Sequence, residues 1–253
     1  MIKKILLWAL IIFTFALTGQ NAYCKAIKKD IQIQTKDKRV IKATISYEKR
    51  DVKQYPTVIL LHSLGYSSEN WGDLPELLNK AGYLVIAMDF RGHGKSIYDG
   101  SLKRKPWVYF TTKAFARFPS DVEAVLTQAQ KDCKEVSLKN YAIVGADIGA
   151  NTAVLVAQEM KTKPKTLVLI SPSTSFKGLY IPIALAQIGQ IPILTMVSDK
   201  DNFSMQEQKS LSKFAQGGYY ARNYPQGGMG MLMIKSNPMM TVDIAKWLLK
   251  YCN

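Results

Sequence analysis

The sequence contains very little histidine: His62 and His93 are the only two in 253 residues. Histidine is the usual side chain that accepts and returns a proton near neutral pH, so at most two imidazoles are candidates for a general base. His62 lies at the end of a predicted strand and His93 in the turn after another, and we expect hydrogen-bonded structural roles for both. A relocated base at His93 remains an alternative.

The chain also lacks an apolar run long enough to span a bilayer comfortably. Lys3 and Lys4 precede the short apolar segment Ile5–Leu17, an arrangement typical of a secretory signal peptide. We expect cleavage near residue 24, which leaves residues 25–253 as a single exported domain, periplasmic or secreted. A retained membrane anchor is the alternative.

Cysteine is scarce, with only Cys24, Cys133 and Cys252. Tyr23 is bulky and directly precedes Cys24, which argues against a lipidated cysteine there. If Cys24 leaves with the signal peptide, two cysteines remain in an oxidising compartment. They follow two predicted helices that we place on opposite faces of a sheet, so we expect no disulfide between them.

Acidic residues are few: 34 Lys and Arg oppose 19 Asp and Glu, a formal charge of +15. Loss of the two signal lysines gives 15 − 2 = +13. Such a protein could meet anionic lipid headgroups or polyanionic envelope polymers, although scattered lysines also simply favour solubility. The segment Lys103–Phe110 is the best candidate for a basic and aromatic patch. With no nucleic-acid-binding motif, we expect a small-molecule ligand, a protein or an anionic membrane surface as partner.

Apolar runs of strand length alternate with helical patterns, which predicts a mainly parallel sheet with helices on both faces. The expected strands are 31–34, 40–47, 57–62, 84–88, 141–144, 166–170, 193–197 and 219–224. The expected helices are 67–81, 120–133 (with Ser120 and Glu123 as a capping box), 151–160, 204–215 and 238–251. We find no internal repeat or linker. No stretch is long enough for a large cap domain, and only residues 97–119 could form partial cover.

The segment Tyr141–Val154 is the centre of the pattern. A short buried strand is followed by Gly145 and Gly149, which bracket a sharp turn, and then by a helix. This layout predicts a nucleophile elbow, where small neighbours let a strained side chain stand above a sheet. The residue at its apex is Asp147.

Several motifs, in order, resemble those of a capless α/β-hydrolase of the dienelactone-hydrolase or serine-aminopeptidase-like kind, over roughly residues 40–250. They are Leu60–Gly65 (Leu-Leu-His-Ser-Leu-Gly), Asp89–Ser96 (Asp-Phe-Arg-Gly-His-Gly-Lys-Ser), Gly145–Gly149, and Ser198–Asp201 followed by Tyr224–Gly230. The resemblance implies an α/β-hydrolase fold: a mainly parallel sheet of about eight strands, helices on both faces and no large cap domain.

The resemblance also implies roles for individual residues. The oxyanion hole would be formed by the backbone N–H groups of Leu64 and Ile148. Ser63 stands where the pattern has glycine, which puts the local backbone angle in doubt. The triad acid would be Asp201, with Asp199 as the alternative.

Two positions depart from the pattern: Asp147 replaces the serine nucleophile and Met229 replaces the histidine base. A serine hydrolase needs a hydroxyl and an imidazole to deprotonate it. Haloalkane dehalogenases and epoxide hydrolases use an aspartate nucleophile, but they still need the histidine to activate water. Methionine has no titratable proton, so Asp147 should react once at most.

Other interpretations of these residues remain open. Asp147 and Asp201, facing one vacancy, would raise the pKa of one carboxyl group or attract a cation, with Asp199 as a further hard-metal ligand. Soft thioethers can hold Cu(I), although methionine also fills irregular apolar gaps. The methionines in question are Met229, Met231, Met233, Met239 and Met240.

The sequence thus favours an exported, non-catalytic descendant of a serine esterase-like or peptidase-like hydrolase, which binds a ligand or partner without cofactor or metal. A neutral or cationic ligand would suit the space above Asp147. One alternative is an active hydrolase with Asp147 as nucleophile, or with a relocated base, acting on esters, epoxides or haloalkanes. Another is a basic envelope-associated or Cu(I)-binding protein.

Overall fold

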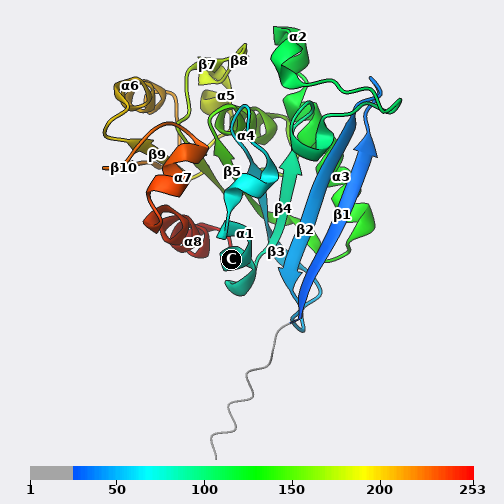
Figure 1. The fold of residues 1–253 in the computed structure, drawn as a ribbon. Coiled ribbons are helices and arrows are strands. Elements are labelled where there is room, and N and C mark those ends of the chain that lie inside the picture. Colours follow the sequence, from blue (N-terminus) through cyan, green and yellow to red (C-terminus); the bar gives the residue numbers. More distant parts are fainter. Residues whose placement is uncertain (1–24) are drawn as a thin grey trace, which may run out of the picture.

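The computed structural model describes residues 25–253, in which one eight-stranded sheet forms the centre of the fold (Figure 1). The strand order is β1-β2-β4-β3-β5-β6-β9-β10. The strands are β1 (Ala26–Gln34), β2 (Val40–Glu48), β3 (Tyr55–Leu61), β4 (Leu84–Asp89), β5 (Val136–Ala146), β6 (Thr166–Ile170), β9 (Ile193–Ser198) and β10 (Tyr219–Tyr224). In this sheet β1 pairs antiparallel with β2, and β2 pairs antiparallel with β4. All other neighbouring strands of the sheet are parallel. The expected fold class is confirmed.

Sequence periodicity explains which strands are covered. In β2, Ile41, Ala43 and Ile45 are buried. Lys42 and Thr44, which lie between them, are partly exposed. This alternation leaves one face of the hairpin wet. The central strands β4 and β6 are buried along their whole length, because helices pack on both of their faces.

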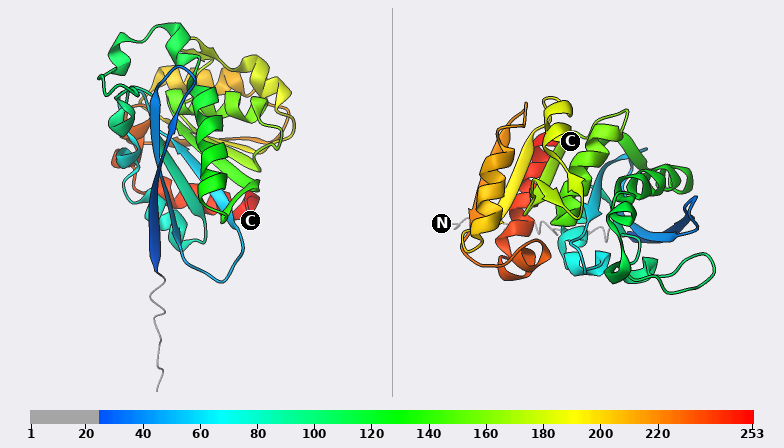
Figure 2. Two further views of the ribbon diagram at one scale, coloured as in Figure 1. Left: turned by 90° about the vertical axis from the view of Figure 1, so that its right-hand side faces the viewer. Right: turned by 90° about the horizontal axis from the view of Figure 1, so that it is seen from above.

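The helices form two layers, one on each face of the sheet (Figure 2). They are α1 (Leu74–Lys80), α2 (Thr112–Phe115), α3 (Phe118–Asp132), α4 (Ile148–Glu159), α5 (Pro182–Gln187), α6 (Asn202–Leu211), α7 (Met231–Ser236) and α8 (Met239–Tyr251). Buried residues of α3, α4 and α5 share one apolar cluster, and those of α1, α7 and α8 share the other. The two remaining strands, β7 (Ser175–Phe176) and β8 (Leu179–Tyr180), form a small antiparallel hairpin between β6 and α5.

Cys133 and Cys252 are both free, and they belong to opposite apolar clusters. The sheet therefore separates the two thiols, as expected. The proposed signal peptide and Cys24 lie outside the described residues. Within residues 25–253, no helix is both long and apolar enough to cross a membrane.

The prediction of one helix over 67–81 is wrong. This segment is split into a 3-10 turn, η1 (Ser68–Trp71), and α1, with Gly72 between them at φ 56° and ψ −128°. That backbone conformation is incompatible with a continuing helix and is available to glycine at little cost. The break lets Trp71 turn inward, where it is fully buried.

The capping box at Ser120 is also wrong. The helix α3 begins two residues earlier, at Phe118, and Pro119 occupies its first turn. Proline suits that position because its missing N–H would have no helical partner there. Ser120 therefore lies inside the helix, and its hydroxyl donates to the Arg117 carbonyl at 2.9 Å.

Candidate functional site

The strand-to-helix elbow is built as the sequence indicates. Asp147 lies between β5 and α4 with φ 56° and ψ −116°. Its N–H donates to the Ile170 carbonyl at 2.8 Å, and its own carbonyl accepts from the Ala150 N–H at 2.9 Å. A non-glycine residue held in this region costs about 1–3 kcal/mol, so the surrounding fold imposes the turn.

The two elbow glycines are required by close backbone contacts. A Cβ at Gly145 would overlap the carbonyl of Gly149, and a Cβ at Gly149 would overlap the carbonyl of Leu61. The first turn of α4 thus lies directly against β5 and β3. This close approach places the Asp147 side chain at the carboxyl end of the sheet, near the loop that follows β3.

The Asp147 carboxylate occupies the donors expected for an oxyanion hole. The Leu64 N–H donates to its Oδ2 at 3.1 Å, and the Ile148 N–H also hydrogen-bonds to this carboxyl group. Asp147 is only 6% exposed. The two N–H groups that would stabilise charge developing on a substrate therefore already have the protein's own anion as their partner.

Burial governs the protonation of this group. The pKa of Asp147 is raised from 3.8 to about 6 by desolvation, while the N–H groups of Leu64 and Ile148 and the charge of Lys177 oppose the rise. The cause is burial in a low-dielectric site, and not a neighbouring carboxylate as the sequence suggested. Asp147 is mostly ionised at pH 7 and takes up a proton near pH 6.

The loop before α7 lies directly on the elbow. The Met231 N–H donates to Ser63 Oγ at 3.0 Å, and the Gly230 N–H donates to Ser171 Oγ at 3.0 Å. A Cβ on Gly230 would overlap Ser63 Oγ and approach Asp147 Cβ to 3.0 Å. The backbone at 230–231 therefore takes up the space next to the Asp147 side chain.

Met229, which the resemblance aligns with the histidine base, is 36% exposed. Of the methionines that follow it, Met231, Met233 and Met240 are buried in the apolar layer under α7 and α8, whereas Met239 is exposed. Their thioethers fill the core. The structure therefore favours packing over a Cu(I) site for this run.

The carboxylates expected near Asp147 are engaged elsewhere. Asp201 caps α6, where its carboxylate accepts from the Ser204 N–H at 3.1 Å and from the Ser204 hydroxyl at 2.6 Å. Asp199 accepts from the Asn223 side chain at 3.0 Å. Throughout residues 25–253, no three carboxylate, imidazole or thiol groups gather where they could hold a metal ion. The hard-metal alternative has no support from this arrangement.

Both histidines are tied to the backbone. His62 donates from Nδ1 to the Ser63 carbonyl at 2.7 Å, and its Nε2 accepts from the Phe90 N–H at 3.0 Å. Burial lowers the pKa of His62 to about 4. Both ring nitrogens of this neutral imidazole are occupied, so it has none free to activate water.

His93 is buried beside His62, and its Nδ1 lies 3.0 Å from the Arg91 carbonyl. Its ring stacks on Trp107 at 5.6 Å, and Nε2 has no hydrogen-bond partner. Burial and the neighbouring His62 lower the pKa of His93 to about 3. No hydrogen bond connects either imidazole to Asp147, so the structure does not assemble the relocated base.

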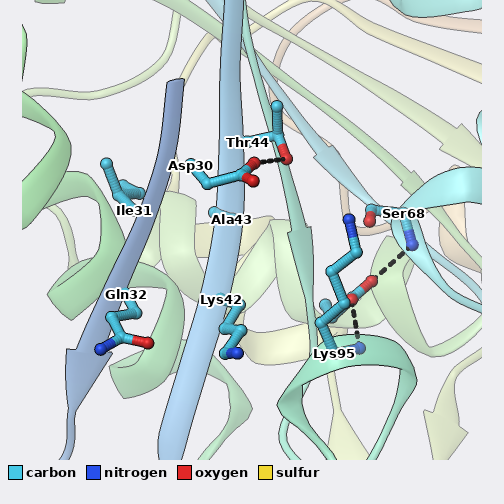
Figure 3. A pocket seen from close by; sticks show the side chains of 9 residues that line it. Asp30, Ile31, Gln32, Lys42, Ala43, Thr44, Ser68 and Lys95 are labelled. Carbon is cyan, nitrogen blue, oxygen red and sulfur yellow. Dashed lines mark hydrogen bonds between the residues drawn. The ribbon is translucent and has the colours of Figure 1, made fainter. Parts of the chain in front are cut away.

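Four recesses in the surface of residues 25–253 are candidates for binding sites. Three of them, of about 250, 590 and 360 Å³, follow the wet face of the β1–β2 hairpin and share Lys95 as a wall. Figure 3 shows the one of about 250 Å³. A fourth, of about 370 Å³, lies beside Trp107, Tyr109 and Arg104. Asp147 lines none of these four recesses.

Comparison with known proteins places the chain in a family. A sequence profile of the alpha/beta hydrolase fold matches residues 56–188, more than half of the chain. The chain therefore belongs to the alpha/beta hydrolase fold family. No curated protein sequence matches it.

Solved structures share the fold at low sequence identity. A dienelactone hydrolase from Anabaena variabilis is 13% identical with a TM-score of 0.71, over 90% of this chain and 99% of that one. An esterase from Pyrococcus furiosus is 20% identical with a TM-score of 0.66, over 90% and 92%. A lipase in an open form is 14% identical with a TM-score of 0.71, over 90% and 100%. At these identities the likeness concerns the fold alone.

Proposed function

We propose that this chain is an exported, non-catalytic member of the alpha/beta hydrolase fold family that acts by binding. The observation that carries the proposal is the hydrogen bond from the Leu64 N–H to Asp147 Oδ2 at 3.1 Å. A substrate carbonyl would need that donor for its own oxygen. Here a buried anion already holds it.

Three further features support the loss of turnover. The base position, Met229, carries no titratable proton. The acid position, Asp201, has Ser204 as its partner. The backbone of Gly230 packs on the apex. Each feature alone would slow a triad hydrolase, and together they remove nucleophile, base and substrate space.

The alternative of an active aspartate nucleophile is less well supported. An attacking carboxylate needs an open approach and a base for the second, hydrolytic half of the reaction. Asp147 is 6% exposed, and both imidazoles hydrogen-bond to backbone groups of their own loops. Binding therefore involves surfaces outside the elbow, and not the space above Asp147 that the sequence suggested.

The test combines turnover and covalent labelling on purified residues 25–253. Activated esters, epoxides and haloalkanes are incubated with the protein, product is followed over many equivalents, and intact mass is recorded. We expect no multiple turnover with any substrate. Turnover that the Asp147→Asn variant abolishes would overturn the proposal, because it would show that this carboxylate performs catalysis. Activity that persists unchanged in the variant identifies a contaminating hydrolase.

Export has a separate test. The full-length chain is expressed in a bacterial host, and the mass of the protein in the periplasmic and secreted fractions is measured. We expect a product that has lost about the first 24 residues. A full-length product that stays in the membrane fraction would contradict removal of the signal segment.

A further inference from the structure

The loop between β4 and α2 contains a tight hairpin that presents a leucine to solvent. The Asp99 side chain accepts from the N–H groups of Ser101 and Lys103 at 2.9 and 3.0 Å. The backbone closes the same turn, with the Leu102 N–H donating to the Asp99 carbonyl at 3.0 Å. Leu102 lies at the tip with φ 59° and is 84% exposed. A leucine in the left-handed region is unfavourable, and at this exposure it contributes no burial to the fold.

A second apolar projection follows within the same loop. The 3-10 turn η3 (Trp107–Tyr109) leaves Val108 58% and Tyr109 83% exposed. Trp107 points inward and stacks on His93 with an interplanar angle of 6°. The tryptophan thus anchors the turn, and its two neighbours face the solvent.

Cationic side chains surround these apolar tips. Lys95, Lys103, Arg104 and Lys105 are all exposed, and Asp99 is the only acidic residue from 95 to 110. The carboxylate of Asp99 is turned into the hairpin, where backbone N–H groups hold its pKa below its ordinary value. The loop therefore presents net positive charge around four exposed apolar side chains, because Tyr98 is also 47% exposed.

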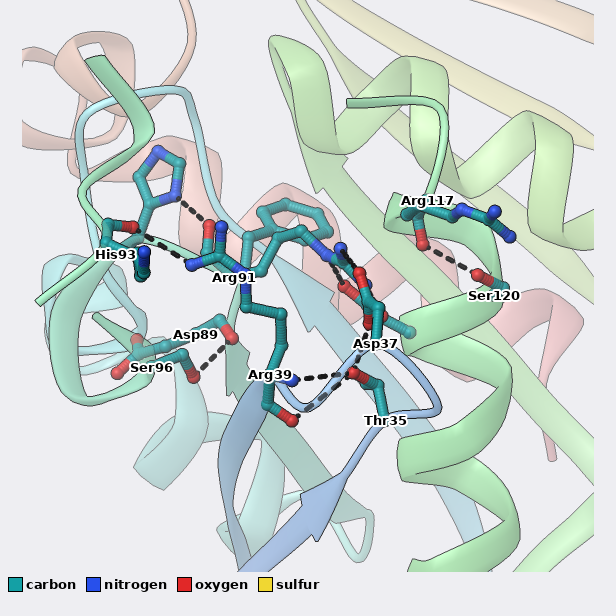
Figure 4. A network of polar contacts seen from close by, with 12 residues as sticks. Thr35, Asp37, Arg39, Asp89, Arg91, His93, Ser96, Arg117 and Ser120 are labelled. Carbon is teal, nitrogen blue, oxygen red and sulfur yellow. Dashed lines mark hydrogen bonds and ion pairs between the residues drawn. The ribbon is translucent and has the colours of Figure 1, made fainter. Parts of the chain in front are cut away.

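The adjacent β1–β2 turn holds the loop in place and adds charge to it. Figure 4 shows Asp37 and Arg39 of this turn beside Arg91. The Gly100 N–H donates to the Lys38 carbonyl at 2.8 Å, and Arg39 Nη1 donates to the Lys105 carbonyl at 3.4 Å. Buried Arg91 pairs with Asp37 at 2.6 Å, so the acidic residue of this turn is compensated. The exposed Lys36 and Lys38 extend the same basic surface.

We propose that this basic–apolar surface, formed by residues 95–109 and the 36–38 turn, docks the protein on a bilayer that contains anionic lipids. Cations near an anionic membrane gain from its surface potential, and apolar side chains at the tip of a rigid loop enter the headgroup region. Single exposed apolar residues are ordinary. Four exposed apolar residues in one cationic loop, one of them in an unfavourable backbone conformation, are not ordinary.

The apolar tips distinguish a membrane from a soluble polyanion. A polyanionic polymer would pair with the lysines and arginine but would gain nothing from Leu102 or Tyr109. The inference rests on the proposed export, which would bring the protein to an envelope membrane, and not on the loss of catalysis. Vesicle binding is measured on purified protein and does not depend on export or on catalysis. A negative result would therefore contradict membrane docking alone and would leave the proposals on export and catalysis to their own tests.

The experiment is co-sedimentation of purified residues 25–253 with vesicles of phosphatidylcholine alone or mixed with phosphatidylglycerol. We expect binding only to the mixed vesicles, and weaker binding as salt is raised, because salt screens exposed charges. Leu102→Ser with Tyr109→Ser should weaken binding at least tenfold. Lys103→Gln with Arg104→Gln should weaken it by about fivefold per charge removed.

Matched controls separate this surface from general charge and hydrophobicity. Met239→Ser removes an apolar side chain that is 59% exposed on α8, and Lys161→Gln with Lys213→Gln removes two exposed lysines elsewhere. Both control variants should bind like the parent. Circular dichroism and the unfolding midpoint of each variant serve to check that it is folded.

Three results would each overturn the proposal. The Leu102 and Tyr109 double variant could bind as tightly as the parent, which together with competition by polyphosphate would indicate a soluble polyanion. The remote lysine variant could lose as much affinity as the loop variant, which would indicate general charge. Alternatively, Leu102→Trp could show no blue shift of its fluorescence on anionic vesicles, which would place the tip outside the bilayer.

Discussion

Replacing Asp147 by asparagine should stabilise the protein at neutral pH. Asp147 is buried, and desolvation raises the pKa of its carboxyl group from 3.8 to about 6. A raised pKa means that the folded state binds the proton more tightly than the unfolded state. Ionising this group in the fold therefore costs free energy, and a neutral amide of the same shape avoids that cost.

The size and sign of the effect follow from linkage. A pKa rise from 3.8 to about 6 corresponds to roughly 3 kcal/mol, at about 1.36 kcal/mol per pKa unit. The cost is absent below about pH 4, grows as the pH rises through the window to about 6, and is complete above it. The Asp147→Asn variant should therefore gain up to about 3 kcal/mol at pH 7.5 and little at pH 4.

The assay is urea unfolding of both proteins at intervals from pH 4 to pH 8. The difference in unfolding free energy isolates residue 147, because the other ionisable groups are common to both proteins and cancel. A variant that is less stable than the parent at pH 7.5 would refute the reasoning. It would mean that the N–H groups of Leu64 and Ile148 outweigh the desolvation of the carboxylate.

Other substitutions test the closed elbow and its supports. Gly230→Ala should lower stability by about 2 kcal/mol, measured by urea unfolding, since the new Cβ would approach Asp147 Cβ to 3.0 Å at a residue with φ 58°; an unchanged midpoint would contradict this packing. Asp121→Asn should cost about 3 kcal/mol, because the buried Arg91 loses the carboxylate 2.6 Å from its Nε; a stability equal to that of the parent would disprove the importance of the pair. Asp147→Ser combined with Met229→His should show no esterase activity, since the base position is 36% exposed; activity towards a nitrophenyl ester would show that the crevice reopens.

The sheet and the elbow could be predicted because their signals are local. Buried parallel strands such as β4 and β6 are continuous apolar runs, and the elbow is defined by glycines at fixed spacing around one residue. The boundaries of the helices are harder to predict from the sequence. The break at Gly72 accompanies the tertiary burial of Trp71, which no local signal reports, and the proline in the first turn of α3 overrides the capping signal of Ser120.

The candidate site was only partly predictable for a different reason. The sequence indicates which N–H groups, Leu64 and Ile148, lie at the elbow, but not what they bind. That the Asp147 carboxylate folds back onto them depends on side-chain direction and on the loop above it. The one available signal was Ser63 in a glycine position. Its hydroxyl proves to be the acceptor for the Met231 N–H.

Two departures from the hydrolase pattern, Ser63 and Asp147, both contact the loop before α7. Ser63 accepts from the backbone after Gly230, Gly230 packs against Asp147, and Asp147 accepts from the Leu64 N–H. The loop therefore packs on both residues, so replacing Asp147 by serine alone would leave the loop in place and Met229 exposed. The strained elbow holds a buried carboxylate whose ionisation costs free energy. The cationic loop lies outside the elbow. We therefore propose that this protein acts through the surface that the loop presents, with the closed elbow as its support.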